Sequence, residues 1–335
     1  MKLKIIFLLS TFVSLCVVNA QNEMKLGIIG LDTSHSPAFI KLINSDNSKP
    51  EFKGFKVVAA YPYGSKTIKS SYERITQYTE EAQAYGVEIT SSIAELLDKV
   101  DCIFLQTNDG SLHLEQAIEV LKAGKIMFID KPVGANLSQT IAIYKLAKQF
   151  NIPVFSSSAL RYVDKNQDLR AGKMSKVLGA DCYSPAPNEP SHANLFWYGI
   201  HGVETLFTIM GAGCTTVSCT SNEGADVATG IWKDGRIGTF RGIRSGAQNY
   251  GGTAFCEKKI EIVGSYSGYE GLLSAILVFF KTREVPVPEE ETLEIYTFME
   301  TANESNRQGG KYISMTIVRN KATKEADKLI KQHGL

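Results

Sequence analysis

Short apolar runs alternate with amphipathic stretches through the first half of the chain. Continuously apolar runs that are too short for helices predict buried strands. They are Lys25–Ile29, Phe55–Ala60, Asp101–Gln106, Lys125–Ile129 and Pro153–Phe155. Because strands of this kind alternate with predicted helices, we expect a parallel sheet that helices cover on both faces. This is a doubly wound α/β fold, whose ligands bind beyond the carboxyl ends of the strands.

Local signals predict where the helices of this half begin and end. Ser36 before Pro37 is a favoured start, and Gly86 is a favoured stop. Ser91 and Ser92 are expected to start the short helix that ends at Leu97. The other predicted helices are Ser65–Tyr85, Leu112–Lys122 and Leu137–Gln149.

The pattern changes after Phe155, where Gly, Ser, Thr and aromatic residues become frequent and apolar residues alternate with a period of two. Alternation predicts strands with one buried face, and Lys233–Arg236 has the composition of a hairpin turn. The predicted strands are Thr216–Thr220, Val227–Trp232, Ile237–Arg241 and Lys259–Val263, and the predicted helices are Glu290–Glu304 and Ala322–Gln332. We therefore expect one domain over residues 24–155 and an α+β domain with an open antiparallel sheet over residues 156–335.

Residues 1–20 have the pattern of a signal peptide. Lys2 and Lys4 precede an apolar run at 5–18, and Val18-Asn19-Ala20 suits cleavage by signal peptidase. The run is too short to span a bilayer. We expect an exported, periplasmic protein with no membrane segment in its mature form. A buried N-terminal helix and a lipoprotein anchored at Cys16 are the alternatives.

Composition and charge narrow the class of protein. The 335 residues carry 36 Lys+Arg and 35 Asp+Glu, and 44% are apolar, which excludes a disordered or collagen-like chain. Because the basic and acidic residues are nearly equal in number, we do not expect a nucleic-acid partner. The cysteines after the leader form no CxxC pair and predict core thiols rather than a metal site, with one or two disulfides as the alternative. They are Cys102, Cys182, Cys214, Cys219 and Cys256.

Four segments, in order, resemble the Gfo/Idh/MocA (glucose–fructose oxidoreductase / inositol dehydrogenase) family. They are Lys25–Gly30, the stretch from Asp101 to Asp130-Lys131-Pro132, Gly199–Glu204 and Glu291–Gly310. The resemblance implies a Rossmann-like dinucleotide-binding domain followed by a domain for substrate binding and homo-oligomer contacts. It also implies hydride transfer between NAD or NADP and a carbon of a sugar, polyol or cyclitol.

The turn after the first strand departs from the family's G-x-G-x-x-G pattern. Asp32 replaces the second glycine and His35 the third. A carboxylate there repels a phosphate by about 4 kcal/mol at ~4 Å and an effective dielectric of ~20. No Asp or Glu lies between Phe55 and Ser71 to bind the adenosine ribose. The resemblance places cofactor contacts at Gly30, Asp32, Thr33, Ser34, His35, Thr107 and Asn108, and a chain without a cofactor is the alternative.

Asp32-Thr33-Ser34-His35 has two interpretations. Short polar side chains often satisfy loop amides and cap the following helix. Alternatively, Asp32 and His35 form an acid–base group at the ligand crevice.

The resemblance also supplies the substrate side of the site. Lys131 matches a lysine that polarises a substrate oxygen or shuttles a proton, and His201 matches a histidine that exchanges the proton of the reacting hydroxyl. The predicted substrate contacts are Arg161, Tyr162, Trp197 and Glu204. No metal is expected.

Three functions are compatible with these residues. The first is an NAD(P)-linked oxidoreductase acting on a sugar or polyol. The second is a non-redox enzyme on the same scaffold, such as a carbohydrate lyase, hydratase or glycosidase-like enzyme. The third is a carbohydrate-binding protein without catalysis. The family resemblance favours the first, whereas the altered turn and the export signal favour the other two.

Overall fold

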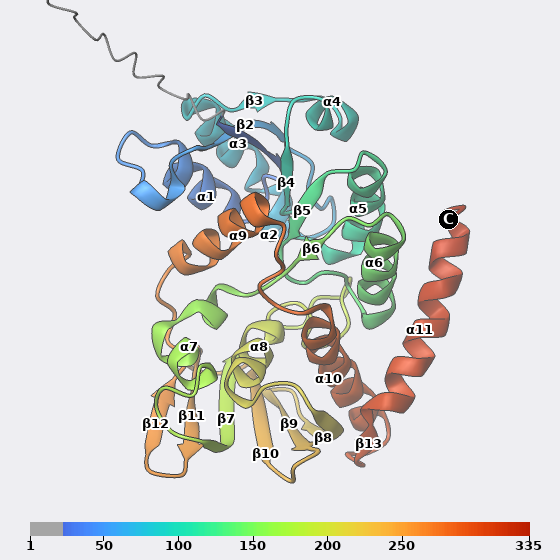
Figure 1. Cartoon of the computed structure of the whole chain (residues 1–335). Coiled ribbons are helices and arrows are strands. Elements are labelled where there is room, and N and C mark those ends of the chain that lie inside the picture. Colours follow the sequence, from blue (N-terminus) through green and yellow to red (C-terminus); the bar gives the residue numbers. More distant parts are fainter. Residues whose placement is uncertain (1–22) are drawn as a thin grey trace, which may run out of the picture.

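The computed structural model describes residues 23–335 and contains two sheets that lie one beyond the other (Figure 1). The predicted signal peptide lies outside the described residues. The first sheet has six parallel strands in the order β3-β2-β1-β4-β5-β6, which confirms the doubly wound prediction. Its strands are β1 (Met24–Ile29), β2 (Phe55–Tyr61), β3 (Glu88–Ile89), β4 (Cys102–Leu105), β5 (Ile126–Ile129) and β6 (Val154–Phe155).

Helices cover both faces of this sheet. The helices of the first half are α1 (His35–Asn44), α2 (Lys69–Tyr72), α3 (Ile75–Ala84), α4 (Ile93–Leu97), α5 (His113–Lys122) and α6 (Leu137–Gln149). Short 3-10 turns lie at Pro50–Phe52, Gly110–Leu112 and Ala159–Tyr162. Side chains of α4, α5 and α6 join one apolar cluster, and those of α1 and α3 join a second.

A helix from the second half of the chain completes the second cluster. α9 (Glu270–Thr282) packs its buried face on the first sheet, beside α1 (Figure 1). The ring centroids of Phe280 and Phe104 lie 5.1 Å apart, and those of Phe279 and Phe155 lie 5.7 Å apart. This helix is not among the elements predicted from the sequence, although its buried residues recur at helical spacing.

Two predicted helix starts differ from the structure for the same reason. Ser36 does not cap α1, since its hydroxyl donates to the carbonyl of Gly30 at 2.8 Å and the helix begins at His35. The predicted helix Ser65–Tyr85 is broken into α2 and α3. Ser65 instead donates from its amide and its hydroxyl to two buried carboxylates at the crevice. Polar contacts across the crevice therefore override the local helix signals.

The second sheet has seven strands in the order β12-β11-β7-β10-β9-β8-β13. β7 and β10 run parallel and the other neighbouring pairs run antiparallel, so the sheet is mostly antiparallel, as expected, with one parallel pair. Its strands are β7 (Val177–Pro185), β8 (Cys214–Ser221), β9 (Ala225–Trp232), β10 (Ile237–Ile243), β11 (Gly251–Cys256), β12 (Ile260–Val263) and β13 (Ile313–Ser314). Three strands of this sheet, β7, β11 and the two-residue β13, are absent from the sequence prediction.

One face of this sheet is covered by helices α8 and α10. The helices of this half, besides α9, are α7 (Asp164–Arg170), α8 (Gly199–Met210), α10 (Glu289–Arg307) and α11 (Met315–Gln332). On the other face Ile237, Ile260 and Ile262 are 54–67% exposed. The predicted homo-oligomer contact through this sheet stays a prediction.

The five cysteines of the described part are free and buried, as expected for core thiols. Within residues 23–335, no group of three or more metal-ligating side chains is present, and no helix is both long and apolar enough to cross a bilayer.

Candidate functional site

The carboxyl ends of the first sheet face the start of α8 across a cavity of about 150 Å³. Loops after β1, β4, β5 and β6 form one side, and residues of the second half form the other. The lining residues are Thr33, Ser34, His35, Arg74, Asn108, Lys131, Ser158, Ala159, Leu160, Tyr198, His201, Tyr250, Tyr266 and Tyr269. Both predicted catalytic residues, Lys131 and His201, therefore line one cavity.

His35 pairs with Asp130 rather than with Asp32. Its Nδ1 lies 2.8 Å from Oδ2 of Asp130, and both side chains are buried. Burial alone would raise the pKa of Asp130, but the nearby charges of His35 and Lys131 and the hydrogen bonds to it hold that pKa below its ordinary value. The acid–base group at this turn therefore uses the carboxylate after β5.

Lys131 is a buried cation that forms no ion pair with the described residues. Its side chain is 7% exposed and lines the cavity, and its Nζ lies 5.3 Å from the ring centroid of Tyr198. The Asp130 carboxylate accepts a hydrogen bond from the backbone amide of Lys131 at 2.8 Å, which fixes the backbone from which the side chain projects. An ammonium in this position can bind and polarise a ligand oxygen.

His201 lines the cavity, and one of its two ring nitrogens is engaged in a hydrogen bond within the protein. Its Nδ1 lies 2.7 Å from the hydroxyl of Ser158, which also accepts from the amide of Leu160. Burial, followed by the nearby positive charges of Lys131 and His35, lowers the pKa of His201 well below its usual value. His201 is thus a neutral imidazole whose Nε2 is available to a ligand.

Asp32 has the structural role that was one of its two interpretations. Its carboxylate is fully buried and accepts from the amides of Asn108 at 2.9 Å and Ser65 at 3.2 Å. Burial raises the pKa of Asp32 to about 6, and these hydrogen bonds oppose that rise. Asp32 therefore joins the loops after β1, β2 and β4.

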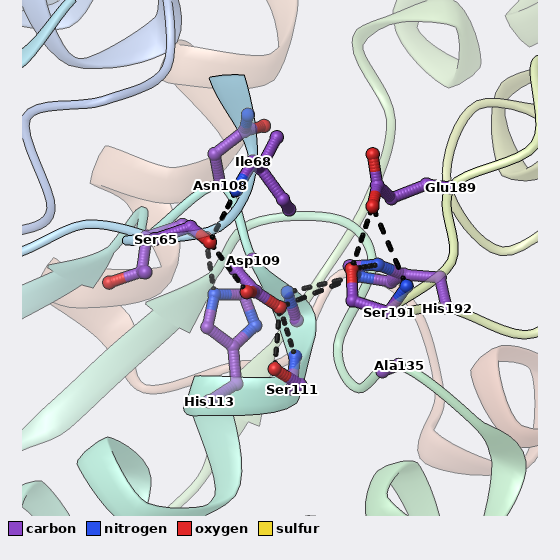
Figure 2. A network of polar contacts seen from close by, with 12 residues as sticks. Ser65, Ile68, Asn108, Asp109, Ser111, His113, Ala135, Glu189, Ser191 and His192 are labelled. Carbon is purple, nitrogen blue, oxygen red and sulfur yellow. Dashed lines mark hydrogen bonds and ion pairs between the residues drawn. The ribbon is translucent and has the colours of Figure 1, made fainter. Parts of the chain in front are cut away.

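A wider polar network holds the same loops together (Figure 2). The hydroxyl of Ser65 donates to Asp109 at 2.9 Å and accepts from the amide of Ile68 at 3.2 Å. The amide of Gly110 donates to Nε2 of His192 at 3.1 Å, so a loop of the second half also takes part. We call the contacts of Asp32, Ser65, Asn108 and Asp109 the crevice clasp.

The crevice clasp bears on the cofactor that the resemblance implies. Dinucleotide-binding turns use their second glycine to let the pyrophosphate approach the backbone. Here the Asp32 carboxylate occupies that turn, and a Cβ added to Gly64 would lie 2.6 Å from its Oδ2. In this arrangement the residues present do not fit a pyrophosphate. The buried Asp32 carboxylate and the segment at Gly64, which packs against it, occupy the space that a pyrophosphate would need.

Gly30 and Thr107, also predicted as cofactor contacts, do not line the cavity. Gly30 has φ +96°, and a Cβ there would fall 2.4 Å from the amide nitrogen of Thr107. The Thr107 hydroxyl donates to Gln116 at 2.8 Å. Both residues serve the close packing of the β1 and β4 turns.

The predicted substrate contacts Arg161 and Glu204 form a buried ion pair instead. Nε of Arg161 lies 2.7 Å from Glu204, and its NH1 lies 2.7 Å from Glu291. Glu204 also accepts from the amide of Ser158 at 2.7 Å. Both side chains are paired within the protein and neither lines the cavity, although NH2 of Arg161 is buried without a hydrogen-bond partner among the described residues.

Tyr162 and Trp197 likewise lie outside the cavity lining. Tyr162 packs against Gly271 at the start of α9. Trp197 is buried, with its ring centroid 4.9 Å from that of His192. Both aromatic side chains support neighbouring loops.

The lining residues that were not predicted from the sequence include Arg74, Tyr250, Tyr266 and Tyr269, besides the backbone segment Ser158–Leu160. The ring centroids of Tyr250 and His201 lie 5.5 Å apart, and those of Tyr269 and His35 lie 4.6 Å apart. The tyrosines stand in Gly- and Ser-rich loops, and only that unusual placement could have marked them. Their meeting at the cavity depends on the return of the chain through α9.

Comparisons with known proteins agree with this architecture. Residues 24–157 match the GFO_IDH_MocA family, described as an oxidoreductase family with an NAD-binding Rossmann fold. The uncharacterized oxidoreductase YhhX of Escherichia coli (strain K12) is 23% identical over 154 residues, which cover 42% of this chain. The match spans 45% of the length of YhhX, less than half of that relative.

Solved structures share the fold over almost the whole described chain. A probable dehydrogenase of Thermotoga maritima has a TM-score of 0.69 at 19% identity, covering 88% of this chain and 100% of its own. Scyllo-inositol dehydrogenase of Lactobacillus casei, solved with NAD(H) and scyllo-inositol, has a TM-score of 0.68 at 14% identity, covering 88% and 99%. Over residues 24–157 the chain is therefore similar to the GFO_IDH_MocA family of oxidoreductases with an NAD-binding Rossmann fold, and over almost its whole described length it shares the fold of these dehydrogenases.

Proposed function

We propose that this oxidoreductase acts on a hydroxyl-bearing carbon of a sugar or polyol, with the cavity between the two sheets as its active site. The observation that carries the proposal is the convergence of Lys131, His201 and the His35–Asp130 pair on that cavity. The inositol dehydrogenase among its structural neighbours supports the substrate class.

The chain's own residues account for the proton of such a reaction. Oxidation of a secondary alcohol to a ketone removes the hydroxyl proton, and neutral His201 can accept it at Nε2. Lys131 stabilises the developing charge on the same oxygen, since its ammonium has no competing carboxylate partner. Asp130 positions Lys131 through its backbone amide.

NAD or NADP is the hydride acceptor that the similarity to this family supports, and its binding requires the crevice clasp to open. A second candidate is a reaction without a dinucleotide, such as elimination or hydration of a carbohydrate. The specific observation in its favour is the buried Asp32 carboxylate in the pyrophosphate position. Both candidates use the same proton-transferring residues.

Calorimetric titration of NAD+ and NADP+ against the mature chain, residues 21–335, separates these candidates. We expect weak binding to the wild type and up to about a thousandfold tighter binding to Asp32→Gly, because about 4 kcal/mol of repulsion is removed. Asp46→Gly, which removes a carboxylate from an exposed loop, should leave the affinity unchanged.

If neither dinucleotide binds the wild type or Asp32→Gly, the redox proposal fails and the second candidate stands. Loss of turnover in both Lys131→Ala and His201→Ala would support either enzyme over a binding protein. Export to the periplasm is a separate proposal, and the pattern of residues 1–20 supports it.

A further inference from the structure

The cavity carries positive charge without a carboxylate to balance it. Two of its lining residues, Lys131 and Arg74, are cations, and no Asp or Glu contributes to the lining. The nearby Asp130 is already engaged by His35 and by the Lys131 amide. Neither cation forms an ion pair within the described residues.

The start of α1 adds further donors. This helix has ten residues and no acidic residue in its first turn, and Thr33 and Ser34 before it line the cavity. The amides of Thr33 and Ser34 donate to no described residue. A helix start of this kind favours an anion. Lys131 is the independent second sign, because its ammonium is only 7% exposed and has the Tyr198 ring but no carboxylate as a partner among the described residues.

The remaining polar lining consists of hydroxyl, amide and imidazole groups, which can both donate and accept but carry no negative charge. Four tyrosines and two serines offer hydroxyl groups, whereas no carboxylate is available to accept from a ligand. A neutral polyol can exchange hydrogen bonds with these hydroxyl groups, but it leaves the charges of Lys131 and Arg74 without a counter-charge. A carboxylate presents two oxygens that can accept from Arg74, from Lys131 or from the α1 amides.

The size of the cavity limits the ligand. Drug-sized ligands occupy pockets of roughly 300–1,000 Å³, and this cavity measures about 150 Å³. A monosaccharide therefore suits it better than a dinucleotide. The Asp32 carboxylate, buried behind Asn108, also disfavours a pyrophosphate close by.

We propose that the substrate is a monosaccharide acid. Its carboxylate lies against Arg74 and the start of α1, and a ring hydroxyl lies between Lys131 and His201. The tyrosines at 198, 250, 266 and 269 surround the sugar ring. This inference rests on the proposed function, because it names the substrate class of the same site.

The test is a calorimetric titration of the mature chain with D-glucuronate, D-galacturonate and D-gluconate, each compared with D-glucose or D-galactose. We expect at least one acid to bind tenfold or more tightly than its neutral counterpart, and the difference to shrink with added salt. Arg74→Gln should weaken that acid by about tenfold to a hundredfold, whereas Arg74→Lys should keep part of the affinity. Arg241→Gln, an exposed arginine on the second sheet, is the matched control and should change nothing.

Three outcomes would overturn the inference. Equal or tighter binding of the neutral sugars would do so and leave the proposed function standing. If inorganic pyrophosphate or NAD+ binds in a way that depends on Arg74, and the sugar acids are not preferred, the positive charge of the cavity serves to bind a nucleotide instead. Failure of every sugar to bind, with circular dichroism showing a folded chain, would remove both the inference and the proposed function.

Discussion

Nδ1 of His35 lies 2.8 Å from Oδ2 of Asp130, although one residue follows β1 and the other follows β5. The contact crosses the end of β4, which lies between these strands in the sheet. Both side chains are buried, so the pair is shielded from solvent. Since Asp130 also accepts from the amide of Lys131, the pair connects the turn after β1 to the backbone of Lys131. It thereby links the residues at the start of α1 to the lysine that lines the cavity.

A double-mutant cycle should detect this contact. For Asp130→Asn and His35→Gln we expect a coupling energy of about 1–3 kcal/mol in urea unfolding, because each single variant leaves a buried polar partner. The coupling should persist in high salt, since buried pairs are screened little. Additive effects of the two substitutions would show that the contact contributes no stability.

Lys131→Met should separate stability from activity. Removing a buried cation without a carboxylate partner is expected to raise the free energy of unfolding by about 1–2 kcal/mol. Turnover of the identified substrate should fall by about a hundredfold or more. Lys125→Met is the control: its Nζ donates to the carbonyl of Val100 at 2.7 Å, so that variant should lose stability. If Lys131→Met were less stable than the wild type, the view that Lys131 is a buried cation without a carboxylate partner would be contradicted.

The Arg161–Glu204–Glu291 group is expected to act on stability rather than on ligand binding. Glu204→Gln should lower the free energy of unfolding by about 3–5 kcal/mol, since it breaks a buried ion pair. The ion pair of exposed Arg307 and half-buried Glu304 provides the comparison, and Glu304→Gln should cost less than about 1 kcal/mol. The ligand affinity of folded Glu204→Gln should equal that of the wild type. A large loss of affinity would mean that Glu204 contacts the substrate, as the sequence predicts.

The pKa of Asp32 predicts a specific dependence of stability on pH. Its folded-state pKa of about 6 lies above the ordinary value of 3.8, so the folded chain binds more protons between these values. The contribution of Asp32 to the free energy of unfolding therefore falls as pH rises from about 4 to about 7, by at most about 3 kcal/mol. Urea unfolding of the wild type and Asp32→Asn across this range measures it. The stability difference should move against the wild type with rising pH, and a constant difference would refute the shift.

The crossing helix α9 should be needed for the stability of the first sheet. Phe280→Ala is expected to cost about 3–5 kcal/mol, because the ring is buried against Phe104. Val278, 59% exposed on the same helix, provides the control, and Val278→Ala should change stability by less than about 0.5 kcal/mol. Equal effects of the two variants would mean that α9 is not part of this core.

Local pattern was sufficient where a segment's own side chains decide its structure. The helix Leu137–Gln149 was predicted to the residue, and Ser92 caps its short helix by accepting from the amide of Glu95. Lys131 and His201 were found through the resemblance, because the sequence carries them in ordered segments beside recognisable strands and helix starts. Helix α9 was missed although its buried residues recur at helical spacing, because its exposed side also carries an apolar residue, Val278.

The sequence by itself determined the doubly wound sheet, and it predicted Lys131 and His201, which line one cavity in the structure. The tertiary structure decided the partners. His35 pairs with Asp130 instead of Asp32, and Asp32 accepts from the amides of Ser65 and Asn108. Arg161 and Glu204 pair with each other instead of lining the predicted substrate site. Apolar periodicity reports which faces are buried, but a buried charge takes whichever partner the crossing of strands brings within reach, and that distance is not written in any local pattern.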